Sequence, residues 1–163
     1  MKRRNFQVSI KHWILLYSLF SILCSFAFAQ TASELDSLLT ADPVSAARAS
    51  RFVLGAADLL PAGISGNEAE KAAFDKAKSN GWINATSGEA VTMKDAAFLI
   101  MKAFDLKGGV MYSLFNNPRY AYREMVYRKL IMGQADQHMK VSGSKLLQIL
   151  DKTLKYTEEN GGI

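Results

Sequence analysis

The sequence predicts an all-α fold: a compact bundle of three degenerate helix-loop-helix repeats after a cleaved N-terminal leader helix. Two observations predict this fold. In the segments that follow a hydroxyl-bearing residue, apolar residues are spaced 3, 4 and 7 positions from one another, which is the pattern of a helix with one apolar face. This pattern begins three times, after Val44, Val91 and Val141, at intervals of 47 and then 50 residues. Periods of this size are typical of repeat architectures.

The first 29 residues predict a secretory signal peptide. The four basic residues of this segment all lie before position 12, an apolar or small-residue run covers 13–26, and an A-x-A sequence follows at 27–29. We expect cleavage after Ala29, leaving residues 30–163 as a single domain exported to the periplasm or cell envelope. The apolar run is short for a bilayer span, which needs about 20 residues, so no span is expected in the mature chain. A retained anchor and a lipid on Cys24 are the alternatives.

Charge and cysteine content limit the function of the mature chain. The whole chain carries a net charge of +5, and the leader accounts for +4 of it, which leaves +1 for residues 30–163. Such a chain has no general positive field with which to hold nucleic acid. The single cysteine is Cys24, inside the leader. The mature chain therefore has no disulfide, no cysteine nucleophile and no cysteine-ligated metal.

The helices are expected in a regular order. A short helix is predicted over 33–39. Ser45, Thr92 and Ser142 then each follow a valine, where a hydroxyl group can cap a helix by accepting a hydrogen bond from a free backbone amide. Asp95, three residues after Thr92, resembles the acidic partner of a capping box and suits the helix dipole.

Two further helices are predicted ahead of the second and third caps. Residues 70–83 and 118–131 each place apolar residues on one helical face and end in an aliphatic or aromatic pair. Pro118 is well suited to a first helical position. Each predicted unit is therefore a helix, a polar loop and a hydroxyl-capped helix, and the first unit clearly shows only its capped helix. Residues 59–66 and 105–117 are predicted as connections.

The order of helix, loop and (V/I)-T-x-x-E resembles the S-layer homology repeat, of which three copies usually form one array. The segment "YAYREMVYRKLIMGQAD" carries the resemblance best, with Gly133 and Asp136 at the family's glycine and aspartate. Residues 91–95 are similar to the family's "iTRaE" segment. Residues 108–127 also resemble a module found before peptidoglycan-binding domains in spirochaetal envelope proteins. The resemblances cover roughly residues 42–156.

In the resembled family, a basic and an acidic residue near the cap help to bind anionic cell-wall glycan in grooves between repeats. Ala46, Met93 and Gly143 stand here at the basic position. The acidic position is kept only as Asp95, because Arg48 and Lys145 occupy it in the other two units. The resemblance therefore implies the fold more directly than it implies the glycan site.

The residues indicate no enzyme, cofactor or metal centre. After the leader, His138 is the only histidine, and one histidine without a second one or a cysteine makes a poor transition-metal site. No nucleophile motif accompanies it. The carboxylates at positions 75, 89, 95, 105, 124 and 136 show no spacing that forces two of them together as a hydrolytic acid pair.

The segment "PRYAYREMVYRK" is the best candidate for a ligand-binding or partner-binding surface. Arg119 and Arg123 are four residues apart and share a helical face, and Tyr120 and Tyr127 lie near it. Guanidinium groups bind carboxylates or phosphates, and tyrosine rings pack on sugars. In the alternative, Tyr122 and Tyr127 belong to the core while the arginines only solubilise the helix.

The connection "GVMYSLF" (109–115) is the second candidate. Its apolar residues, which include Met111 and Phe115, are expected to pack onto the repeats. If they were exposed instead, they would mark a partner site.

Together these patterns predict an exported, non-enzymatic binding or scaffold module of the bacterial cell envelope. In one version residues 109–115 dock an envelope protein. In the other a groove between repeats holds an anionic cell-wall glycan or peptidoglycan, with Arg119, Arg123 and Tyr120 as its principal contacts. The missing basic residues at the caps favour the envelope protein, and the oligomeric state stays open.

Overall fold

The computed structural model describes residues 32–133 and 136–160. The predicted leader, its cleavage after Ala29 and Cys24 lie outside the described residues. The chain divides into two units, Met1–Ser37 and Leu38–Ile163. In the first unit residues 32–37 are helical, and this helix ends at Leu39 in the second. The described residues form helices, turns and two isolated β-bridges, so the predicted all-α class is confirmed.

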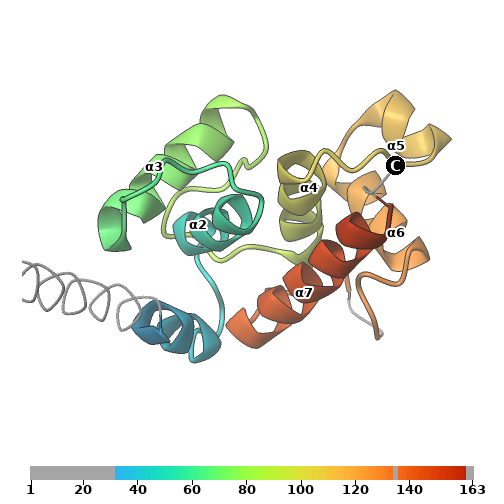
Figure 1. Ribbon diagram of the computed structural model, residues 1–163. Coiled ribbons are helices and arrows are strands. Elements are labelled where there is room, and N and C mark those ends of the chain that lie inside the picture. The colour runs from blue at the N-terminus through green and yellow to red at the C-terminus, as the bar shows by residue number, and fades with distance from the viewer. Residues whose placement is uncertain (1–31, 134–135, 161–163) are drawn as a thin grey trace, which may run out of the picture. The chain divides into compact units, whose positions relative to one another are not determined.

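The second unit is a bundle of helices (Figure 1). In chain order they are α2 (Ala46–Ala56), α3 (Gly66–Ser79), α4 (Met93–Ala103), α5 (Val110–Phe115), α6 (Pro118–Tyr127) and α7 (Gly143–Asn160). The prediction of a helix ahead of the second cap is confirmed, although α3 begins four residues before the predicted start. The prediction for 105–117 is incomplete, because this connection contains α5.

The three predicted caps lie at the starts of α2, α4 and α7. In each case the side-chain oxygen accepts a hydrogen bond from the backbone amide three residues on, at 3.4 Å, in Ser45, Thr92 and Ser142 alike. The hydroxyl of Thr92 also donates to the carboxylate of Asp95. Asn117 caps α6 in the same way, at 3.1 Å, and Pro118 follows it at the first helical position. A polar side chain thus satisfies one free amide at each of these four starts.

The valines before the caps form a closed ring of backbone hydrogen bonds. The amide of Val44 donates to the carbonyl of Val141 at 2.9 Å, Val141 donates to Val91 at 3.0 Å, and Val91 donates to Val44 at 3.0 Å. Each valine donates once and accepts once, and all three are buried. Segments about 50 residues apart in the chain therefore meet at one point, from which α2, α4 and α7 begin.

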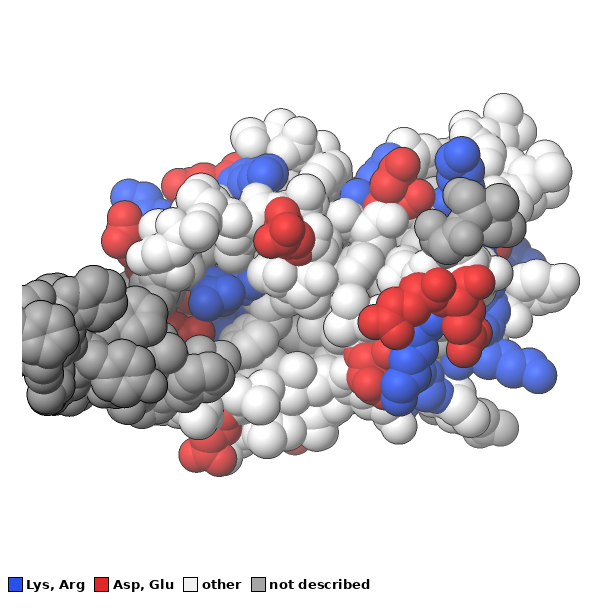
Figure 2. Space-filling model, in the orientation of Figure 1, with Lys and Arg blue, Asp and Glu red and all other residues white. Residues whose placement is uncertain are grey.

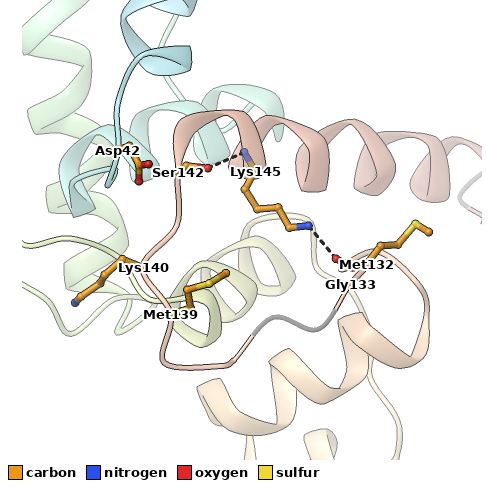
Figure 3. A pocket seen from close by; sticks show the side chains of 7 residues that line it. All are labelled: Asp42, Met132, Gly133, Met139, Lys140, Ser142 and Lys145. Atoms are coloured by element: carbon orange, nitrogen blue, oxygen red, sulfur yellow. Dashed lines mark hydrogen bonds between the residues drawn. The ribbon is translucent and has the colours of Figure 1, made fainter.

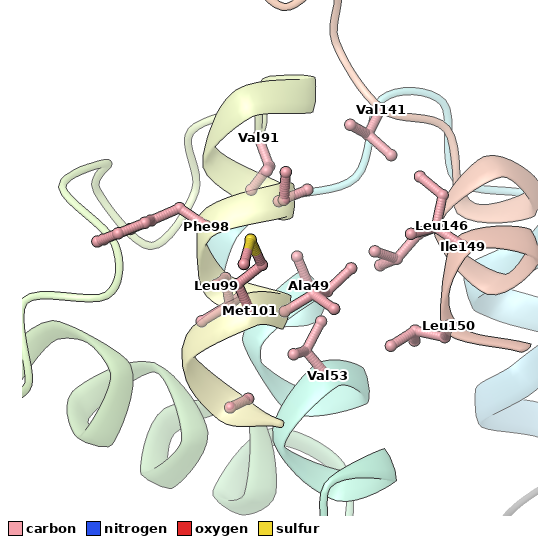
Figure 4. Packing of buried hydrophobic residues seen from close by; sticks show 14 of the residues in the cluster. Ala49, Val53, Val91, Phe98, Leu99, Met101, Val141, Leu146, Ile149 and Leu150 are labelled. Carbon is pink, nitrogen blue, oxygen red and sulfur yellow. The ribbon is translucent and has the colours of Figure 1, made fainter. Parts of the chain in front are cut away.

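The apolar faces of α2, α4 and α7 supply the core below this ring. Figure 4 shows side chains from all three helices pointing toward one another, with Ala49 and Val53 on α2, Leu99 on α4, and Leu146 and Ile149 on α7. All five of these side chains are at most 1% exposed. Helix α3 packs on α2, and α6 packs on α4. Each of these two capped helices therefore pairs with a helix that comes later in the chain, whereas the predicted unit placed the partner helix ahead of the cap.

Helices α2, α3, α4 and α6 end in the same way. The residue after the C-cap has a positive φ, and the next amide bonds back to a carbonyl five residues earlier, for example Leu130 to Met125 at 2.9 Å. This is the Schellman motif, which favours glycine at the positive-φ position. Only α3 has a glycine there, Gly81, while α6 has Lys129 with φ of 59°.

Candidate functional site

Helix α5 has six residues and lies in the connection between α4 and α6. It begins after Gly109 and ends at Asn116, which adopts the left-handed conformation with φ of 43°. Tyr112 is its one buried residue, at 7% exposed. Burial, and then the negative charge of Asp105, raise the pKa of the Tyr112 phenol above its ordinary value.

The other large apolar residues of α5 face the solvent. Val110 is 79% exposed, Met111 57%, Leu114 71% and Phe115 53%. We call these four residues the α5 ridge. Figure 2 shows a largely uncharged surface over α5, at the upper right of the view. The expectation that residues 109–115 pack onto the bundle is therefore wrong, because so short a helix buries only one side and Tyr112 occupies it.

Glu124 of α6 holds the start of α5 through a hydrogen bond and also forms an ion pair with Arg128. The carboxylate of Glu124 accepts a hydrogen bond from the backbone amide of Gly109 at 3.0 Å and another from the side chain of Arg128 at 2.9 Å. Arg128 also donates to the carbonyl of Lys107 and lies over the ring of Tyr156, 5.2 Å from its centroid. The side chains of both ion-pair residues are only 16% exposed. Arg128, which adds to the basic character of this segment in the sequence, therefore has a structural role.

The residues predicted on α6 divide between two positions. Tyr120 is half-buried and stacks on Phe115 of the α5 ridge, with ring centroids 5.2 Å apart. Arg119 and Arg123 are both exposed, as predicted from their spacing. Tyr127, at the end of α6, is 84% exposed, so the alternative that placed it in the core is wrong. Tyr122 is half-buried. The structure thus brings Phe115 and Tyr120 together.

A pocket of about 370 Å³ opens beside the start of α7 (Figure 3). Sequence reasoning did not find it, because its residues come from two distant segments. Lys145 donates through its ammonium group to the carbonyl of Met132 at 2.9 Å. The pocket is lined by Asp42, Met132, Gly133, Met139, Lys140, Ser142 and Lys145. With two lysines and the carboxylate of Asp42, the lining carries a net charge of +1.

The cap positions at which the resembled family carries a basic residue are closed to solvent in this chain. Ala46 and Met93 are fully buried, and Gly143 is buried as well. A charged side chain at these positions would lose its hydration without a partner. The glycan-binding arrangement implied by the family is therefore not reproduced at the caps.

Outside these surfaces, we considered the histidine and the acidic residues of the described segments as catalytic or metal-binding groups. His138 is exposed, its amide donates to the Asp136 carboxylate at 3.0 Å, and Lys94 lies 3.4 Å from its ring. Across 32–133 and 136–160, no three His, Cys, Asp or Glu side chains gather as a metal site would require. No helix in this part of the chain combines the length and apolarity needed to cross a bilayer.

Comparison of the chain with protein-family models, with curated proteins and with solved structures finds no match. The geometry of the chain itself therefore carries the functional argument. The candidate surface is the α5 ridge with its neighbouring α6 residues.

Proposed function

We propose that this protein is an exported, non-enzymatic module of the bacterial cell envelope, built from three degenerate S-layer-homology-like units, and that it binds an envelope protein. The valine ring and the three equivalent caps support the proposal of three related units. The basic, apolar and small-residue order of the first 29 residues supports export.

The α5 ridge is the observation that carries the binding proposal. Four large apolar side chains face water on one short helix. Removing apolar surface from water is favourable by about 25 cal/mol per Å², and contiguous exposed patches are typical of interaction sites. A scaffold that only had to remain folded would gain nothing from leaving this surface uncovered.

The ridge is also held in place before any partner binds. Tyr112 buries one side of α5, Glu124 accepts a hydrogen bond from the amide of its N-cap residue, and Tyr120 stacks against Phe115 at its end. A preorganised surface loses little conformational entropy on association. Helix α5 therefore has the rigidity, as well as the apolar character, of an interface anchor. The four side chains of the α5 ridge are apolar or aromatic, so the proposal includes no reaction.

Recovery of proteins from an envelope fraction tests this function. We expect the exported protein to retain a specific envelope protein, identified by mass spectrometry, and the Phe115→Asp variant to lose it. Leu39→Asp is the matched control, because Leu39 has a similar exposure of 49% and lies outside α5. Equal recovery by Phe115→Asp and the control, or no specific protein at all, would contradict the proposal.

Binding of anionic cell-wall glycan is the second candidate. The observation that favours it is the exposed pair of Arg119 and Arg123 on one face of α6, beside the ring of Tyr120. This function predicts co-sedimentation with purified cell wall. The sedimented fraction should fall in an Arg119→Ala/Arg123→Ala variant and at high salt, since screening weakens exposed charge interactions. Protein binding predicts no sedimentation.

A further inference from the structure

Positive charge gathers in the segment around the α5 ridge, although residues 30–163 together carry only +1. Residues 105–129 contain five basic and two acidic residues, a net charge of +3. Residues 30–163 together carry +1, so the remainder of that stretch carries −2. A local excess of one sign steers association toward partners of the opposite sign.

Part of this charge is free to meet a partner. Glu124 is already engaged by Arg128 and by the base of α5. Arg119 and Arg123 are exposed, and within the described residues neither forms an ion pair with a carboxylate. They lie one helical turn apart, on the helix whose Tyr120 stacks on Phe115. Two exposed guanidinium groups therefore lie on the helix that contacts the α5 ridge, and Arg119 is the chain neighbour of Tyr120.

Two other occupants fit this surface less well. A second copy would bring the same net positive charge against itself in a symmetric contact, and like charges across an interface cost several kcal/mol. Helices that lie in a bilayer surface carry basic side chains on their own polar face and are many residues long. Helix α5 has six residues and no charge. Arg, Tyr, Phe and Met, by contrast, are enriched at protein interfaces.

We infer that the partner contributes an acidic amphipathic segment. Its apolar side chains cover the α5 ridge, and two of its carboxylates, about one helical turn apart, bind Arg119 and Arg123. Carboxylates accept two parallel hydrogen bonds from a guanidinium group, which sets the register of the segment on α6. This inference rests on the proposed protein-binding function and specifies the partner's chemistry.

Site-specific crosslinking identifies the bound segment. The photoreactive residue p-benzoylphenylalanine is incorporated in place of Leu114, the exported protein is irradiated in cells, and the adduct is sequenced. We expect a peptide with apolar residues and at least two Asp or Glu residues within about one helical turn of each other. A neutral or basic peptide would overturn the inference and leave the proposed function intact. An adduct with lipid alone, or no protein adduct, would overturn both.

Charge reversal then tests the two arginines directly, with the crosslinked peptide as the probe. We expect Arg119→Glu/Arg123→Glu to raise the Kd by at least about tenfold at low salt, and the difference to shrink as salt is added. Lys71→Glu/Lys155→Glu makes the same change in net charge at two exposed lysines on α3 and α7 and should leave the Kd within about twofold. An equal rise in Kd in both variants, or no rise in either, would contradict the binding of the partner's carboxylates to Arg119 and Arg123.

Discussion

Gly143, at the start of α7, is a residue that the packing leaves no room to enlarge. A Cβ atom there would lie 1.7 Å from the carbonyl oxygen of Leu38 and 2.6 Å from its carbonyl carbon. The amide of Gly143 also donates to the carbonyl of Ala41 at 2.9 Å. The backbone of the 38–41 segment therefore passes directly over the first turn of α7, and only a residue without a side chain fits beneath it.

We expect Gly143→Ala to lower the free energy of unfolding by about 3 kcal/mol, the upper range for forcing an atom into a packed interior. Urea denaturation followed by circular dichroism measures the loss. The control is Gly88→Ala, because nothing lies within 4 Å of a Cβ at Gly88 and its φ is not positive. That variant should stay within about 0.5 kcal/mol of the parent. A tolerated Gly143→Ala would show that Leu38 is not held over α7.

At the scale of the element, the helix C-termini differ in backbone strain, which a glycine at the positive-φ position relieves. Lys129 closes α6 with φ of 59°, whereas Gly81 closes α3 at the equivalent place with φ of 67°. A left-handed conformation costs an ordinary L-residue about 1 kcal/mol, and glycine adopts it freely. The two helices thus use the same motif with different local stability.

We expect Lys129→Gly to raise the free energy of unfolding by about 1 kcal/mol, and Gly81→Lys to lower it by a similar amount. Neither change meets a packing obstacle, since Lys129 is exposed and nothing lies within 4 Å of a Cβ at Gly81. Thermal unfolding of both variants, compared with the parent, measures the two shifts. Shifts of the same sign would contradict the conclusion that α3 and α6 end in the same positive-φ conformation.

The sequence predicted the starts of the helices better than the role of the connections. Ser45, Thr92 and Ser142 could be placed because an N-cap is a local signal that depends on the next three residues. The position of α5 could not be, since "VMYSLF" has too few residues for a helical period and its apolar content is typical of packed segments. Whether such a segment is covered depends on neighbours far along the chain, such as Glu124.

At the scale of the whole molecule, the valine ring joins the three capped helices at one point. Sequence register predicted that Val44, Val91 and Val141 are equivalent. It did not reveal that they bond to one another, because a backbone amide leaves no trace of its partner in the sequence. The different roles of the arginines on and after α6 were likewise only partly predictable. The spacing of Arg119 and Arg123 indicates a shared face, whereas the engagement of Arg128 depends on Glu124 and on the carbonyl of Lys107.

We expect the amides of Val44, Val91 and Val141 to exchange with deuterium at the same slow rate, governed by unfolding of the whole second unit. Each lies in the closed ring and is at most 1% exposed, so opening one bond requires the segments to separate. Hydrogen exchange followed by NMR measures the three rates. One valine that exchanges orders of magnitude faster than the other two would show that the ring opens locally.

The ring has a consequence for how this architecture can vary. Its three members meet through a backbone amide and carbonyl, which every amino acid except proline supplies, so the junction places few demands on the residues farther out. The stretch leading from α4 to α6 can therefore accept an extra turn such as α5 while the junction is maintained. Such a junction permits one of the three connected segments to gain a new surface while the other two keep their structure.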